Sequence, residues 1–354
     1  MGKCNQPRSD ITAMHREVTG SSILVVNSLP NQQTIRFVVD CGLFQEREYE
    51  ELNSELLFNP ENIDFCIITH NHVDHVGRVP FLVKKGFNKE IYTTVETSKL
   101  LPISLGDSYR VLKDTYKRKN ERCLYDEEDV DKTLSLVKPC EYEKIMHIGE
   151  HIKITFFNNG HLVGAAIVLV QISYPGCKSI NLLFTGDYNN KNMFFDVKKI
   201  PKWVVKLPLT VIQESTYGDM DSTCITKTFK KNVKECIEKG GTVIALVFSL
   251  GRAQEILYEI KTMQDEGELE DIPIYFDGKL AIRYTNLYIN GELNIKEEMR
   301  DFLPKNLEIV DKSTRMSVLN DTSKKIILTT SGMGSYGPAQ LYIPEYITDR
   351  KSVV

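Results

Sequence analysis

The stretch THNHVDHVGR, residues 69–78, places three histidines and an aspartate within six positions, although the chain of 354 residues has only 7 His. The apolar run before it predicts a short buried strand that ends at these polar residues. His70 and His72 alternate by two, so an extended backbone points both side chains to one side. Asp74 and His75 follow in a turn. Imidazole and carboxylate suit zinc or a similar transition metal, and four ligands so close together favour two adjacent ions over one tetrahedral ion.

Three further polar residues stand beside apolar runs elsewhere in the first half of the chain. They are Asp40 in FVVDCGLFQ, His161 in NNGHLVGAA and Asp187 in LLFTGDYN. Taken in this order with H-x-H-x-D-H after an apolar strand, the four motifs resemble those of the metallo-β-lactamase fold.

That resemblance implies two zinc ions (Zn²⁺) and a role for each residue. The implied ligands are His70, His72 and His161 for the first ion, Asp74 and His75 for the second, and Asp187 as the bridge between them. Asp40 would lie outside the ligand set and orient the histidines. Two ions with a bridging hydroxide imply hydrolysis at neutral pH, but the fold hosts amide, thioester and phosphodiester hydrolysis alike.

Three motifs in the second half narrow the substrate class. QESTYGD (213–219), FSLGRAQEIL (248–257) and LTTSGMGSYGPAQ (328–340) resemble, in order and spacing, the β-CASP domain inserted into metallo-β-lactamase nucleases. The resemblance runs from about Asp40 to about Leu341. It is greatest to the cleavage and polyadenylation nuclease subunit and its stand-alone bacterial and archaeal relatives. It implies that Glu214 supports a histidine that protonates the leaving group.

Two of these motifs are glycine-rich loops that suit phosphate binding. Each joins an expected strand to an expected helix, where free backbone N–H groups face an anion and glycine allows a close approach. Arg252 could add a bidentate contact. The candidate substrate-binding residues are Ser249, Gly251, Arg252, Ser331, Gly332 and Gly334.

The apolar patterns predict an α/β protein with two domains. The first half reads as short strands joined by turns, with a helical pattern over 96–138. From about residue 208, strands alternate with helical stretches at about 222–239, 251–264 and 279–300, which implies a parallel sheet covered by helices. With the resemblance, we expect a metallo-β-lactamase αββα sandwich in residues 1–207 and an incomplete β-CASP domain in residues 208–348.

Composition indicates the class of protein and its cellular location. Hydrophobic residues make up 42% and charged residues 26%, as in globular proteins, and the apolar runs are too short to span a bilayer. The 8 Cys form no C-x-x-C pair, which favours reduced thiols and a cytoplasmic location, with no membrane partner. A net charge of −4 does not by itself indicate nucleic-acid binding, but bound metal and basic patches create the local field.

The chain departs from the family pattern beyond the β-CASP motifs. The family has two more histidines there, a proton donor paired with Glu214 and a ligand of the second zinc, whereas this sequence has no His after His161. GPAQLYIPEYI predicts a helix. DRKSVV resembles translated sequencing-adapter DNA, so residues 349–354 are expected to be a non-native tail. We therefore expect a missing C-terminal part, tight binding of the first zinc, weak binding of the second and weak catalysis.

The leading functional prediction is a zinc-dependent RNA phosphodiester hydrolase, an endoribonuclease with 5′ exonuclease activity as a further option. Its partner would be single-stranded RNA, with DNA left open, and the full-length protein could form a homodimer. The candidate catalytic residues are Asp74, Glu214 and Asp40. The alternatives are a small ester or thioester metallohydrolase, which the β-CASP motifs oppose, and an inactive paralogue that binds RNA or a nuclease partner, which the intact metal ligands oppose.

Overall fold

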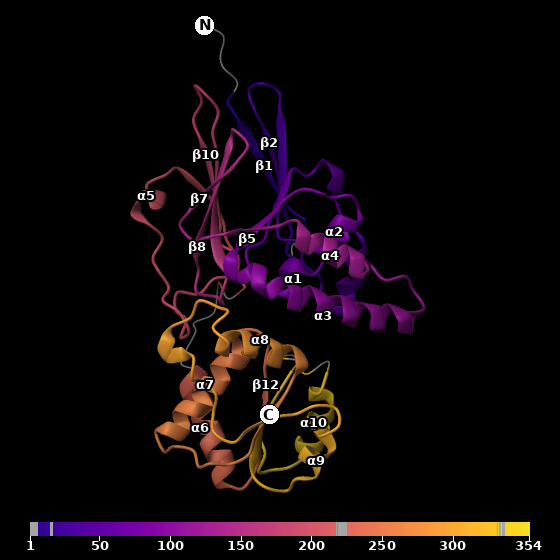
Figure 1. Cartoon of the computed structure of the whole chain (residues 1–354), viewed down its shortest axis with the longest axis vertical. Helices are drawn as coiled ribbons and strands as arrows, with labels where there is room; N and C mark the ends of the chain where they lie inside the picture. Colours follow the sequence, from indigo (N-terminus) through magenta and orange to yellow (C-terminus); the bar gives the residue numbers. More distant parts are fainter. Residues whose placement is uncertain are drawn as a thin grey trace. The chain divides into compact units, whose positions relative to one another are not determined.

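A computed structural model describes residues 6–14, 17–216, 218, 225–330, 332, 334 and 337–354. It divides the chain into two compact units, Met1–Thr216 and Tyr217–Val354, which Figure 1 draws in successive colours of the sequence. Of the helices in these described ranges, none combines the length and apolarity that crossing a membrane requires.

The first unit contains two β-sheets. The six-stranded sheet has the order β1-β2-β3-β4-β5-β6, and its strands are β1 (Arg8–Ala13), β2 (Ile23–Ser28), β3 (Thr34–Val39), β4 (Phe65–Ile67), β5 (Ile91–Thr94) and β6 (Val137–Cys140). β1 to β3 pair antiparallel and β3 to β6 pair parallel. The five-stranded sheet has the order β11-β10-β9-β8-β7, with β7 (Ile145–Ile148), β8 (Ile152–Asn158), β9 (Ala166–Ile172), β10 (Ile180–Phe184) and β11 (Leu209–Ile212).

Alternating side chains give each central strand two buried faces. In β3, Phe37 points into the core shared by the two sheets, whereas Val38 joins the core beneath the helices. In β4, Phe65 and Cys66 divide in the same way, and the Phe37 and Phe65 rings stack with centroids 4.8 Å apart. Strands buried on both faces read as continuous apolar runs. The run of β3 ends at Asp40, and the run that contains β4 ends at Thr69.

Helices cover the outer side of the six-stranded sheet. They are α1 (Val73–Val76), α2 (Val79–Lys84), α3 (Val95–Lys119) and α4 (Glu127–Ser135), and they lie together on one side of the first unit (Figure 1). The helical pattern expected over 96–138 is thereby confirmed, with β6 at its end. Two 3-10 turns, η1 (Arg47–Ser54) and η2 (Pro60–Asn62), precede β4. On the other sheet, Val204 of α5 (Lys202–Val205) packs against Phe157 and Leu183.

The second unit is a parallel sheet between two groups of helices. The sheet has the order β12-β15-β13-β14, with β12 (Thr242–Leu246), β13 (Ile274–Asp277), β14 (Leu307–Ile309) and β15 (Lys325–Thr329). Its helices are α6 (Ile225–Glu238), α7 (Arg252–Asp265), α8 (Lys279–Ile289), η3 (Glu297–Met299), α9 (Arg315–Asn320) and α10 (Ala339–Tyr346). α6 and α7 lie on one face and α9 and α10 on the other (Figure 1), which confirms the α/β class expected from the sequence.

Two expectations about the second half differ from the structure. β11 was expected to open the second domain, but it pairs in parallel with β10, and the two units part after Thr216 rather than near residue 208. The apolar pattern of a strand does not identify the sheet that it joins. The helix expected over 279–300 ends at Ile289, because Gly291 adopts a left-handed φ of 75° just beyond the cap, a common helix stop.

Residues beyond α10 lie against the edge of β12. The Val353 N–H donates to the Thr242 carbonyl at 3.0 Å, and the Ile244 N–H donates to the Val353 carbonyl at 2.8 Å. Residues of the suspected non-native tail therefore add to this sheet edge. Its non-native origin stays a prediction.

The loop after β3 crosses the loop after β4 at very close range. The Cys41 N–H donates to the His75 carbonyl at 2.8 Å, and the Leu43 N–H donates to the Val73 carbonyl at 3.0 Å. A Cβ at Gly42 would lie 1.5 Å from the Asp74 carbonyl oxygen. Only glycine lets the two backbones approach so closely.

Replacing Gly42 by alanine should therefore lower the free energy of unfolding by about 1–3 kcal/mol, because overpacking forces the two loops apart. Gly106→Ala is the matched control, since a Cβ there meets no atom within 4 Å in the middle of α3. It should raise stability by up to about 1 kcal/mol through helix propensity. Urea unfolding of both variants measures the difference, and an unchanged stability of Gly42→Ala would contradict the close approach.

Candidate metal centre

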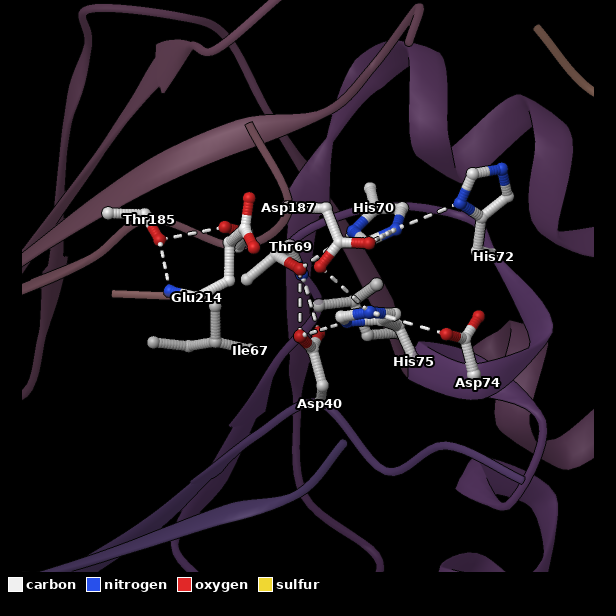
Figure 2. A network of polar contacts seen from close by, with 12 residues as sticks. Asp40, Ile67, Thr69, His70, His72, Asp74, His75, Thr185, Asp187 and Glu214 are labelled. Atoms are coloured by element: carbon white, nitrogen blue, oxygen red, sulfur yellow. Dashed lines mark hydrogen bonds and ion pairs between the residues drawn. The ribbon is translucent and has the colours of Figure 1, made fainter. Parts of the chain in front are cut away.

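Four loops that are far apart in the sequence meet at one end of the two sheets. Asp40 directly follows β3, the segment 70–75 follows β4 and leads into α1, His161 lies in the loop after β8, and Asp187 lies in the loop after β10. Figure 2 shows the Asp40, His70, His72, His75 and Asp187 side chains converging on one another. The structure thus brings together the residues that the sequence proposed as metal ligands.

Four of the side chains form a group that can hold one metal ion. The group consists of His70, His72, His161 and Asp187, whose ligand atoms all lie within 4.8 Å of one another. His72 Nδ1 lies 3.2 Å from His70 Nε2 and 3.1 Å from His161 Nε2. Two nitrogens on one tetrahedral zinc, each about 2.0–2.1 Å from it, lie about 3.3 Å apart. The donor set and its spacing therefore fit zinc.

A second set of ligand atoms lies on the other side of the Asp187 carboxylate. His75 Nε2 is 3.3 Å from Asp187 Oδ1 and 3.8 Å from Asp74 Oδ2. Asp187 Oδ2 instead faces the first group, 3.8 Å from Nε2 of His70. The two oxygens of one carboxylate therefore point to two different ligand sets, as a carboxylate between two ions would.

The electrostatics around His70 and Asp187 favour the protonation states that a metal requires. Burial, with the neighbouring histidines, holds the pKa of His70 well below its usual range. Burial would raise the pKa of Asp187, but the hydrogen bond and charge of His75 outweigh it and lower that pKa. A neutral imidazole and an ionised carboxylate are the forms that coordinate metals.

Positive charge is favoured on the buried His75 ring. Burial opposes protonation of this ring, but the Asp40 carboxylate, followed by Asp187 and Asp74, outweighs burial and holds the pKa of His75 well above its ordinary value. Three carboxylates around one buried point create a negative potential there. That potential suits a metal cation beside His75.

Asp40 is the buried acceptor that organises the ligand loop. Its carboxylate is 2% exposed and accepts hydrogen bonds from the Thr69 N–H at 2.8 Å, the Thr69 hydroxyl at 2.7 Å and His75 Nδ1 at 2.8 Å. The Asp40 N–H donates to the Ile67 carbonyl at 2.8 Å. Figure 2 shows Asp40 beneath these residues, outside the ligand set, where the resemblance implied it would lie.

Asn159 is a site residue that the sequence analysis did not single out. It is buried, and its amide donates to the Thr185 carbonyl at 3.1 Å and the Asp187 carbonyl at 2.7 Å. Its side-chain oxygen accepts from the His161 N–H at 3.1 Å. One side chain therefore fixes the loops of two candidate ligands. Its position two residues before His161 in NNGH was the available signal.

Glu214 lies just after β11 and is held by its own turn. Its backbone N–H donates to the Thr185 hydroxyl at 3.2 Å, and its carboxylate accepts from the Thr216 N–H at 2.8 Å. Thr185 also lies two residues before Asp187, and Figure 2 shows Glu214 on this side of the centre. Glu214 therefore lies just past a strand end, near the candidate ligand Asp187, and its catalytic role stays a prediction.

The candidate phosphate loops lie at the carboxyl ends of the adjacent parallel strands β12 and β15. A Cβ at Gly332 would lie 3.1 Å from the Phe248 ring, so the two loops touch. The first loop departs from expectation, because the Gly251 N–H already donates to Gln254 Oε1 at 2.8 Å and Arg252 pairs with Glu255 at 2.6 Å. Ser249 precedes this cap and Gly334 lies within the second loop. Ser331 lies outside the described residues.

Comparison with known proteins finds matches over both units. Residues 30–203 match the family model of the metallo-beta-lactamase superfamily domain, and residues 253–354 match that of the Beta-Casp domain. A ribonuclease of Thermus thermophilus is 30% identical over 351 residues, which cover 96% of this chain and 76% of that protein. Transcription termination factor FttA of Methanosarcina mazei is 31% identical over 341 residues, covering 90% and 51%. The Integrator complex subunit 11 homolog of Dictyostelium discoideum is 33% identical over 286 residues, covering 74% and 37%.

The chain spans about half the length of the termination factor, since the match covers 51% of it. It spans a larger share of the ribonuclease, 76%.

The Asn159 bridge leads to a test of the ligand loops. Asn159→Ala should lower the free energy of unfolding by about 1–3 kcal/mol, because it leaves buried backbone groups unsatisfied, and it should also weaken zinc binding. Asn53→Ala is the matched control: among the described residues, the side chain of buried Asn53 exchanges its hydrogen bonds with the backbone of Phe44. It should cost similar stability without changing zinc affinity. Chemical unfolding and chelator competition separate the two effects, and equal zinc affinity in both variants would contradict the assigned role.

Proposed function

Because the chain belongs to the β-CASP family of metallo-β-lactamase-fold proteins, we propose that it is a metal-dependent ribonuclease. The family matches confirm the resemblance inferred from the motifs, and one relative that matches along nearly the whole chain is a ribonuclease. The observation that carries the proposal is the convergence of His70, His72, His161 and Asp187, with ligand atoms within 4.8 Å of one another. That group suits metal-assisted hydrolysis.

We propose zinc as the metal and two adjacent ions as the full complement. The first ion would be held by His70, His72, His161 and Asp187, and the second by Asp74, His75 and the other oxygen of Asp187. When bound, zinc lowers the pKa of a water molecule toward neutrality and supplies a nucleophile at physiological pH.

The chain's own residues prepare the centre for that chemistry. The Asp40 carboxylate accepts a hydrogen bond from the Nδ1–H of His75, which leaves Nε2 of that ring directed at Asp74 and Asp187. Burial keeps bulk water away from His70, which is fully buried, and thereby strengthens the electrostatic interactions there. Glu214 would support protonation of the leaving group, a role for which the family uses a histidine partner.

The proposed substrate is single-stranded RNA, cleaved at internal phosphodiester bonds and with 5′ exonucleolytic attack as a further mode. Ser249, Gly251, Arg252, Gly332 and Gly334 stay proposed phosphate-binding positions. Within the first loop, the exposed Arg252 guanidinium is the group best able to reach a phosphate, since its side chain is 62% exposed although paired with Glu255. A homodimer of the full-length protein and a cytoplasmic location also stay predictions.

Turnover assays distinguish the ribonuclease from the two alternatives. With added zinc, the chain should cleave a single-stranded RNA and should leave a chromogenic β-lactam and a thioester intact. Loss of a residue that only orients a metal ligand lowers activity by about 10- to 100-fold. His70→Ala removes a proposed ligand itself and should reduce RNA cleavage by more than that. His147→Ala, a change at an exposed histidine of β7, should have no effect. Thioester turnover without RNA cleavage would contradict the proposed ribonuclease. RNA binding with no turnover would favour the inactive paralogue.

Zinc titration tests the proposed ligand sets separately from turnover. The first ion has four protein ligands and should bind tightly, whereas the second has three, one of them shared, and should bind more weakly. Metal analysis after dialysis against a mild chelator should therefore find about one zinc per chain, rising toward two when zinc is in excess. Asp74→Asn should remove only the weak step. Loss of the tight step in that variant would show that the two sets are assigned wrongly.

A further inference from the structure

Thr69 occupies the point where Asp40, His70 and both sheets meet. It is 1% exposed and lies two residues after β4, which ends at Ile67. Its hydroxyl lies 2.7 Å from Asp40 Oδ2 and 3.1 Å from His70 Nδ1, and Figure 2 shows the hydroxyl between these two side chains.

The direction of each hydrogen bond follows from the groups involved. An ionised carboxylate only accepts, so the Thr69 hydroxyl donates its single proton to Asp40. The hydroxyl oxygen then accepts from His70, whose Nδ1 must carry the ring proton. His70 Nε2 is left as the lone-pair nitrogen, and this is the atom that lies 3.2 Å from His72 Nδ1. This relay, the pair of hydrogen bonds from His70 through the Thr69 hydroxyl to Asp40, therefore selects the tautomer that presents Nε2 to a metal.

The same carboxylate oxygen also orients the ligand on the other side of the centre. Asp40 Oδ2 lies 2.8 Å from His75 Nδ1, so it fixes His75 directly and His70 through the Thr69 hydroxyl. We propose that Thr69 is a positioning residue that transmits the orienting effect of Asp40 to His70 and so couples the two metal-ligand sets.

The backbone of Thr69 keeps this hydroxyl in place. The Thr69 N–H donates to Asp40 Oδ1 at 2.8 Å, and its carbonyl accepts from the Ala166 N–H of β9 at 3.0 Å. A Cβ at Gly186, which has a φ of 55°, would lie 3.0 Å from Thr69 Cβ. The backbone of the Asp187 loop therefore lies close beside the Thr69 side chain.

Removing the hydroxyl separates its polar role from its shape. In Thr69→Val a methyl group replaces the hydroxyl at nearly constant volume, so the His70 Nδ1–H loses its acceptor in a buried place. The ring can then adopt the other tautomer or turn, and either change draws Nε2 away from the ligand group. Thr69→Ser keeps the hydroxyl and should keep the relay.

The test is zinc affinity measured by chelator competition, together with the visible spectrum of the cobalt(II)-substituted protein. Thr69→Val should weaken the tight zinc step by about 10- to 100-fold, as loss of an outer partner does, and should alter the cobalt spectrum, whereas Thr69→Ser should resemble the wild type. Thr93→Val is the matched control, because Thr93 is also buried and its hydroxyl donates at 3.0 Å to the Ile68 carbonyl without touching a ligand. It should leave affinity and spectrum unchanged.

A double-mutant cycle identifies the route through Asp40. If the hydroxyl acts through that carboxylate, adding Thr69→Val to Asp40→Asn should weaken zinc binding much less than it does in the wild type. Additive effects, wild-type affinity in Thr69→Val, or equal losses in Thr69→Val and Thr93→Val would each overturn the inference. The inference rests on the proposed metal centre. A wild-type chain that binds no zinc would overturn both, whereas zinc binding that is insensitive to Thr69→Val would overturn this inference alone.

Discussion

The buried carboxylate of Asp40 is the constraint on which the arrangement of the centre depends. A carboxylate with 2% exposure is stable only when hydrogen-bond donors replace its water, and here three donors from Thr69 and His75 do so. Asp40 also has a left-handed φ of 60°, which aspartate tolerates better than most residues. The donors that satisfy Asp40 belong to the loop that carries His70, His72 and His75. The hydrogen bonds that stabilise the buried charge therefore also position the histidines.

The ends of strands from both sheets supply the rest of the geometry. Backbone pairing holds the strands in place, and His70, His161 and Asp187 each lie three residues past a strand end, where polar side chains can leave the apolar core. Asn159 joins the loops of His161 and Asp187, and Thr69 joins the β4 loop to β9. Gly42 lets the first two loops touch. The centre is therefore supported by short polar links between loops, each made by one residue, rather than by any single element.

Residue types, spacing and the family resemblance predicted the members of the centre and one support, Asp40, but not Thr69 or Asn159. The ligands carry chemistry that is rare elsewhere in the chain, so H-x-H-x-D-H and the strand-end His161 and Asp187 were recognisable. Thr69 and Asn159 are common polar residues, and only their partners distinguish them. The same limit explains Gly251, whose N–H was expected to be free for phosphate: the sequence contains Gln254, but only the folded turn brings its side-chain oxygen to that N–H.

The sequence by itself determined the α/β class, the two parts of the chain, the candidate metal ligands and the family, because apolar periodicity and chemically distinctive motifs are local properties. The tertiary structure alone decided that β11 joins the first unit, that the two oxygens of Asp187 face different ligand sets, and that one oxygen of Asp40 serves two histidines. The physical reason is that strand pairing and hydrogen-bond partners are relations between distant segments. A strand carries the same apolar pattern whichever neighbour it pairs with, and a polar side chain acquires its role only from the groups that the fold brings within about 3 Å of it.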